Sequence, residues 1–234
     1  SQAPSGVTAA YRLGWTVLLL LPVVLLRCRA ELRRVTARDL VLCGASGVLL
    51  ALHFLTWFES LKRTSVASST VLVSTEVIFT ALGFALFLHG KIPRLGVWAI
   101  LLAFGGSALL ALSGGGGAGE LSGNLLALAA ASAAAVYTLI GRIQRGHLST
   151  TVYTFLTYLA CFLTLLLGTA AAGTPLTGYG GREWLIGLAL AVLCTLLGHS
   201  LFSWCLKYLS PSYVSAAKLC EPVFSSLAAI PLFG

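Results

Sequence analysis

The stretch Val66–Leu88, VASSTVLVSTEVIFTALGFALFL, decides the fold class, because it is an apolar run that carries only one charged residue. A helix rises about 1.5 Å per residue and the hydrocarbon core of a bilayer is about 30 Å thick, so this run is long enough to cross a membrane. Its single carboxylate, Glu76, would lie about 15 Å deep, close to the midplane. An acidic side chain at that depth is costly unless it is paired, protonated or in contact with water.

A second carboxylate, Glu221, has the same setting in the run Tyr213–Phe233, YVSAAKLCEPVFSSLAAIPLF. It also falls close to mid-depth if this run crosses a membrane. Pro222 follows it and removes a backbone donor, so we expect a local helix distortion there. The chain is therefore predicted to be organised around two buried acids.

Composition predicts an all-α, polytopic transmembrane bundle. Of the 234 residues, 58% are hydrophobic and 9% are charged, and the mean hydropathy is +0.94, whereas soluble domains carry about 25% charged residues. The net charge of +8 does not indicate a nucleic-acid partner, because the basic residues lie in short loops between apolar runs. Eight apolar runs are predicted to span the membrane, at about Val7–Leu26, Leu40–Phe58, Val66–Leu88, Leu95–Leu112, Leu121–Ile140, Ser149–Ala172, Trp184–Trp204 and Tyr213–Phe233.

The distribution of lysine and arginine over alternate loops predicts the orientation of the bundle. One set of loops holds ten basic residues and the opposite set holds four, with Lys218 left inside a span. By the positive-inside rule the first set is cytoplasmic. The first set comprises Arg27, Arg29, Arg33, Arg34, Arg38, Lys91, Arg94, Arg142, Arg145 and Lys207, and the second Arg12, Lys62, Arg63 and Arg182.

A weak internal repeat relates the two acidic runs. A shift of 145 positions (221 minus 76) aligns Glu76 with Glu221 and Lys62 with Lys207. The two copies are five spans apart, an odd number, so they cross the membrane in opposite directions. Inverted repeats of this kind are typical of secondary transporters, whose substrate site lies near the midplane. The other identities in this register are Leu61 with Leu206, Ser65 with Ser210, Phe79 with Phe224 and Leu82 with Leu227.

Two segments resemble the EamA type of the drug/metabolite transporter (DMT) superfamily. They are LHFLTWFESLKRTSVASSTVLVSTEVIF at Leu52–Phe79 and SPSYVSAAKLCEPVFSSLAAIPLFG at Ser210–Gly234. The second is the more specific, because its EPVF core matches the ninth helix of that family. The first departs from the family pattern, since Val77 follows Glu76 where a proline is usual, and His89 begins His-Gly-Lys where Gly-Glu is common.

The resemblance implies two inverted five-helix repeats, of which about eight of ten helices are present. Residues 1–112 would form the first repeat without its first helix, and residues 113–234 the second repeat without its last. It also implies a multi-pass protein of the cell membrane, not an enzyme, that exports small metabolites such as amino acids by alternating access. The expected partners are a small-molecule substrate and the lipid bilayer, with possible proton coupling, and with no cofactor, metal or nucleic acid.

The candidate residues for substrate or proton binding are Glu76, Glu221, Lys218, His53 and His199. Each acid either lines a transport path, where it could take up and lose a proton, or is a structural group bonded to a neighbouring helix. Lys218 precedes Glu221 by three residues, so it could pair with it on one helix face, contact a substrate carboxylate, or snorkel to the cytoplasmic surface. A lone histidine in a helix is more often a satisfied structural group than a proton carrier.

Two other classes of protein remain as alternatives. The first is an integral-membrane enzyme that uses the buried glutamates and a histidine as acid and base, although the chain contains no HExxH or GxSxG spacing. The second is a purely structural or receptor-like bundle, which has no need of buried charges at positions related by a repeat. A transport assay in vesicles and a turnover assay distinguish the three.

Overall fold

The computed structural model describes residues 3–92, 94, 97, 98, 100–102, 105 and 121–220. Every regular element in these residues is a helix, which confirms the prediction of an all-α protein. The predicted spans at 95–112 and 213–233 lie largely outside the described residues. Six helical segments of the described residues are long and apolar enough to cross a membrane, at Ser5–Arg27, Ala37–Arg63, Ser68–Phe87, Leu121–Gln144, Thr150–Ala171 and Gly181–Cys205.

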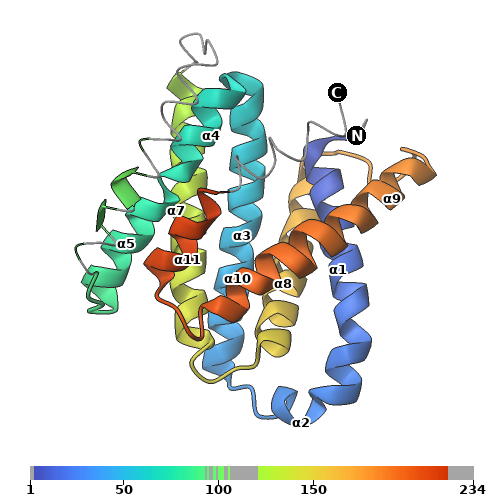
Figure 1. Ribbon diagram of the computed structural model, residues 1–234. Coiled ribbons are helices and arrows are strands. Elements are labelled where there is room, and N and C mark those ends of the chain that lie inside the picture. The colour runs from blue at the N-terminus through green and yellow to red at the C-terminus, as the bar shows by residue number, and fades with distance from the viewer. Residues whose placement is uncertain are drawn as a thin grey trace.

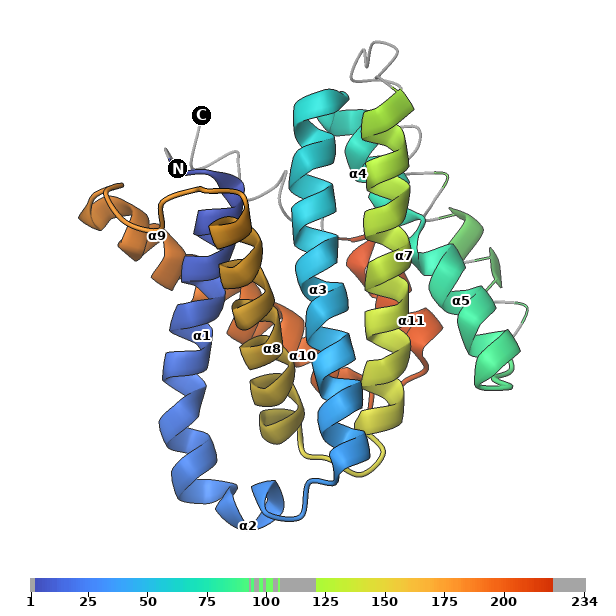
Figure 2. The same cartoon turned by 180° about the vertical axis from the view of Figure 1, so that it is seen from behind.

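The bundle is built around α3 (Ala37–Arg63), which packs along α7 (Leu121–Gln144) on one side and α8 (Thr150–Ala171) on the other (Figures 1 and 2). Gly47 of α3 permits the close approach of α8, because a Cβ atom at this position would lie 2.4 Å from the carbonyl oxygen of Thr157. The next helix outward is α1, which packs on α8. Its bounds are Ser5–Arg27.

The acidic run breaks into two helices, α4 (Val66–Ser74) and α5 (Glu76–Phe87). At the break, both the amide and the hydroxyl of Thr75 donate to the carbonyl of Leu72, at 3.2 and 2.6 Å. These bonds close a tighter turn than the α-helix, and a threonine hydroxyl bonded to nearby backbone in this way competes with the regular ladder. The run still forms one candidate span at Ser68–Phe87, but the break directly before Glu76 was not predicted.

The last long span is not a uniform α-helix either. It runs obliquely across the bundle as α9 (Gly181–Leu190), η1 (Ala191–His199) and α10 (Ser200–Cys205) (Figure 1). The segment η1 is a π-helix, a wider form that is rare and that occurs frequently at functional sites. It packs against α1.

The helix α11 (Pro211–Lys218) is the counterpart of α4 in the register found in the sequence. The two helices begin 145 positions apart, at residues 66 and 211. Their N-caps correspond as well, because the Ser65 hydroxyl accepts from the amide of Ser68 and the Ser210 hydroxyl from the amide of Tyr213. Since α4 enters from the end opposite α2 and α11 from the end that carries α2, the two run in opposite directions (Figure 1).

The turns that carry most of the described basic residues lie at one end of the bundle. This end holds α2 (Arg29–Leu32), the turn between α7 and α8, and the turn between α10 and α11 (Figures 1 and 2). It is the end that the positive-inside rule assigns to the cytoplasm. We refer to it below as the cytoplasmic end.

Candidate functional site

A buried ion pair joins the first half of the chain to the second. The Lys218 ammonium lies 2.6 Å from Oε1 of Glu76, and the hydroxyl of Thr138 on α7 donates to the same oxygen at 3.1 Å. The two charged side chains are 17% and 11% exposed, respectively. Removing one charge of a buried pair leaves the other uncompensated, so this contact is a strong constraint on how α5 and α11 sit together.

Each charge of the ion pair lies at the end of a helix where the helix dipole stabilises it. Glu76 is the first residue of α5, next to the partly positive end of the helix dipole. Lys218 is the last residue of α11, next to the partly negative end. The start of α5 and the end of α11 therefore meet at this ion pair, and α11 packs beside α5 and α7.

Of the alternatives for Lys218, the structure does not show snorkelling to the cytoplasmic surface, because its ammonium lies 2.6 Å from Oε1 of Glu76. Glu221, the other expected partner of Lys218, lies outside the described residues, so a pairing of Lys218 with Glu221 stays a prediction.

Both candidate histidines lie in the interior. Nδ1 of His53 is 3.0 Å from the carbonyl oxygen of Ala130 on α7, and since a carbonyl can only accept, Nδ1 carries the proton. The His53 ring stacks on Trp57, with ring centroids 6.0 Å apart. His199, at the end of η1, makes edge contacts with the rings of Phe54 and Tyr137 at 5.9 and 6.5 Å.

Arg12 reaches the same interior from α1. Its Nε donates to the hydroxyl of Thr195 in η1 at 2.6 Å, and its guanidinium carbon lies 4.9 Å from the ring centroid of Phe54. Counting Arg12 among the outer loop residues was therefore wrong, and the asymmetry that orients the bundle becomes ten against three. The available signal was a charge within the apolar run Val7–Leu26, the same signal that singled out Glu76.

These charged and titratable groups form one electrostatic cluster, which we call the interior cluster: Arg12, His53, Glu76, His199 and Lys218. His53 lies within electrostatic range of Glu76, Lys218 and Arg12, and His199 within range of Arg12, Lys218 and His53. Four of the five predicted residues are thus brought together, from helices in both halves of the chain.

Neutral side chains complete the surroundings of the interior cluster, and sequence reasoning missed most of them. The Lys218 ammonium lies 5.8 Å from the ring centroid of Phe202, and Thr138 bonds to Glu76. Two buried polar atoms nearby have no hydrogen-bond partner among the described residues, Nε1 of Trp57 and Oγ1 of Thr80. Threonine and aromatic residues are so common in membrane helices that nothing in the sequence separated these from packing residues.

A different carboxylate is buried at the cytoplasmic end. Asp39, in the first turn of α3, accepts from the amide and the hydroxyl of Thr36 at 3.0 and 2.7 Å. Its other oxygen is 3.1 Å from the amide nitrogen of Gln144 and 2.8 Å from Nε2 of His147. These bonds cap α3 and tie it to the end of α7, so they have a structural role.

A bundle of membrane-crossing helices, with a helix broken beside a buried ion pair in the interior, is typical of transport proteins. The chain belongs to the EamA-like transporter family, whose family model matches residues 1–112 and again residues 121–234. This membership places it in the DMT superfamily, whose members are multi-pass membrane proteins that transport rather than catalyse.

The comparison with solved structures supports the same fold. Twenty-eight chains of known structure match. One of them, a crystal structure described only as that of a protein, aligns with a TM-score of 0.77 over 99% of this chain and 80% of its own length, at 19% identity. At that identity the likeness concerns the fold alone. Among curated proteins, none matches the sequence.

Proposed function

We propose that the protein is a secondary transporter that exports small metabolites carrying a carboxylate and an amino group, such as amino acids, by alternating access. The observation that carries this proposal is the ion pair between Glu76 and Lys218, because it links the start of α5 in the first half of the chain to the end of α11 in the second half. In alternating access one half rocks against the other around a central site. A contact between the halves at that site must break and re-form in every cycle.

Glu76 is the group that exchanges its partner in this proposal. Its Oε1 is occupied by Lys218 and Thr138, whereas Oε2 accepts no hydrogen bond from the described residues. When α11 moves away, the carboxylate loses its counter-ion in a poorly solvated interior. A substrate ammonium or a proton then replaces Lys218, since either one neutralises the buried charge. This exchange gives proton coupling a physical basis.

The remaining charges of the interior cluster suit a carboxylate on the substrate. Arg12 and Lys218 place a guanidinium and an ammonium group in the interior cluster, on helices from the two halves of the chain. A guanidinium binds a carboxylate through two parallel hydrogen bonds. Arg12 is therefore the proposed carboxylate partner, and the released ammonium of Lys218 a second.

Residues 1–112 and 113–234 are the two halves that move in this proposal, and Glu221 is the counterpart of Glu76 in the second half. The shared start and N-cap of α4 and α11 support the pairing of these halves. His53 and His199 line the same interior, where they can donate hydrogen bonds to a bound substrate.

Transport by the full-length protein in proteoliposomes tests the proposal. We expect uptake of a labelled amino acid from a panel, faster than that of the matching amine without a carboxylate or the matching acid without an amine. Glu76→Gln should abolish the transport. Glu59→Gln is the matched control, because it removes an exposed carboxylate of the neighbouring helix, and it should leave transport unchanged. Equal rates in Glu76→Gln and the unmodified protein would overturn the proposal.

A further inference from the structure

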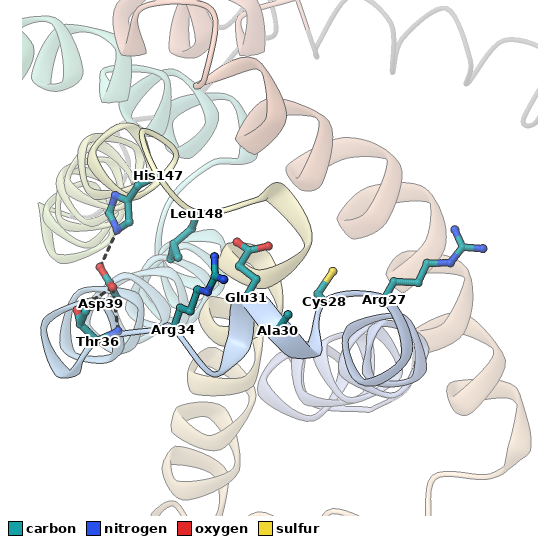
Figure 3. Close-up of a pocket in the computed structure, with 9 residues that line it drawn as sticks. All are labelled: Arg27, Cys28, Ala30, Glu31, Arg34, Thr36, Asp39, His147 and Leu148. Atoms are coloured by element: carbon teal, nitrogen blue, oxygen red, sulfur yellow. Dashed lines mark hydrogen bonds and ion pairs between the residues drawn. The ribbon is translucent and has the colours of Figure 1, made fainter.

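The cytoplasmic end contains a cavity that the transport site does not use. It has a volume of about 520 Å³ and lies between α2 and the turn that joins α7 to α8 (Figure 3). Its size is in the range of small-molecule sites in proteins. The lining residues are Arg27, Cys28, Ala30, Glu31, Arg34, Thr36, Asp39, His147 and Leu148.

The acidic groups of this cavity are already engaged by the protein. Glu31 accepts from the backbone amide of Ser149 at 2.6 Å and so caps the first turn of α8. Asp39 receives hydrogen bonds on both oxygens, including one from His147. Neither carboxylate therefore has strong unused capacity for a cation.

The two arginines of the cavity, by contrast, are not engaged by other described residues. The side chains of Arg27 and Arg34 make no hydrogen bond or ion pair with any described residue, and both residues are exposed. Partial burial, reinforced by the charge of Glu31, raises the pKa of the Cys28 thiol, so this group stays uncharged at neutral pH. The free binding capacity of the cavity is thus cationic, and it suits an anion with several oxygen atoms.

The cavity lies at the level where the apolar surface of the helices ends. Leu25 and Leu26 at the end of α1 are 50% and 83% exposed, and Leu40 and Val41 near the start of α3 are 52% and 70% exposed. Exposed leucine and valine on membrane helices face acyl chains. The cavity between them is therefore at the height of the lipid headgroups.

We propose that this cavity binds the phosphate headgroup of an anionic phospholipid from the cytoplasmic leaflet through the guanidinium of Arg34, which lies among the other lining residues (Figure 3). Arg27, whose side chain extends away from them in the structure, supplies a second positive charge. Guanidinium pairs with phosphate through two parallel hydrogen bonds, and basic pockets between membrane helices on the cytoplasmic side bind such headgroups. The acyl chains lie along the exposed leucines of α1 and α3. A bound lipid would connect α2 to the turn between α7 and α8.

Native mass spectrometry of the full-length protein, titrated with phosphatidylglycerol or phosphatidylcholine, tests this proposal. We expect Arg27→Gln/Arg34→Gln to weaken phosphatidylglycerol binding by at least about tenfold. The matched control, Arg29→Gln/Arg33→Gln, removes the same charge from the same segment but from residues outside the cavity lining, and it should bind as the unmodified protein does. If the first double variant does not fold, Arg34→Lys, which keeps the charge but not the planar fork, should still weaken binding measurably.

Three results would overturn the proposal. Equal weakening in both double variants would show that only general surface charge matters. Unchanged binding in Arg27→Gln/Arg34→Gln would exclude the cavity. Glycerol phosphate binding as tightly as phosphatidylglycerol would assign the cavity to a soluble phosphate compound instead of a lipid.

Discussion

Asp39 and Glu76 are both buried carboxylates, with 6% and 8% of their surface exposed, but the protein holds them in different ways. Asp39 accepts four hydrogen bonds, which occupy both of its oxygens, from Thr36, Gln144 and His147. A carboxylate with this many donors is satisfied in one arrangement and resists change.

From the described residues Glu76 accepts two hydrogen bonds, both on one oxygen, and both donors, Thr138 and Lys218, belong to the second half of the chain. In the proposed transport cycle, its charge therefore depends on a partner that moves away when the halves separate. The difference shows that a buried carboxylate can have either of two roles, depending on where its hydrogen-bond donors come from. A carboxylate bonded on both oxygens within one end of the bundle stabilises the fold, whereas in the proposed function a carboxylate bonded by the opposite half exchanges its partner.

The largest effect is expected from Lys218→Ala, which breaks the pair and leaves Glu76 uncompensated. We expect a loss of about 3 to 5 kcal/mol in the free energy of unfolding at neutral pH, together with loss of transport. Denaturant unfolding in detergent at neutral pH measures the change in stability. Unchanged stability and transport would show that Lys218 does not pair in the interior.

A smaller effect is expected from Asp39→Asn. The change leaves hydrogen-bond donors of Thr36, Gln144 or His147 without a full acceptor, at a cost of about 1 to 3 kcal/mol. Transport per folded molecule should remain as in the unmodified protein. Unfolding curves and transport by the same purified sample measure both quantities. Loss of transport with normal stability would contradict the structural role of Asp39.

Gly47→Val tests a contribution to stability that involves no charged group. A side chain at this position meets the backbone of α8 at less than 3.0 Å, and overpacking of this kind costs about 1 to 3 kcal/mol. The matched control is Gly44→Val, because a Cβ atom at Gly44 meets none of the described residues within 4 Å. Thermal unfolding should show a decrease for the first variant alone. Equal decreases would mean that α3 and α8 do not approach each other at Gly47.

The smallest effect is expected from Glu59→Gln, which concerns a third carboxylate with a different setting. Glu59 is 38% exposed and pairs with Lys62 and Arg63 at 3.0 Å. Exposed pairs of this kind contribute about 0 to 1 kcal/mol. Unfolding in low and high salt should therefore differ little between this variant and the unmodified protein. A loss above 1 kcal/mol would mean that exposure does not separate Glu59 from the buried acids.

Much of the fold could be predicted from the sequence, because apolar runs and basic loops follow directly from the demands of a bilayer. The runs around Glu76 and His53 appear as helices close to the predicted bounds. The register of 145 residues also agrees with the shared start of α4 and α11. These features depend on composition and spacing, which the sequence contains in full.

The details of the site could not be predicted in the same way. The break at Thr75 depends on a hydroxyl bonded to backbone, and threonine makes such bonds in many unbroken helices. The partner of Lys218 lies 142 positions away, so only the packing of α11 on α5 identifies it. Arg12 is a charged residue within an apolar run, which is the signal that indicates a buried charge. It was nevertheless counted as a loop residue, because it lies near the start of that run. The π-helix that receives it had no signal in the apolar sequence.

The double variant Glu76→Gln/Lys218→Met tests the central claim, that an exchangeable ion pair between the two halves drives transport, most directly. Replacing both members of a buried pair by neutral groups removes the uncompensated charge, so we expect stability within about 1 kcal/mol of the unmodified protein. Transport measured on the same reconstituted sample should be absent, because nothing remains to exchange with a proton or a substrate ammonium. A stable double variant that transports at the normal rate would contradict the claim.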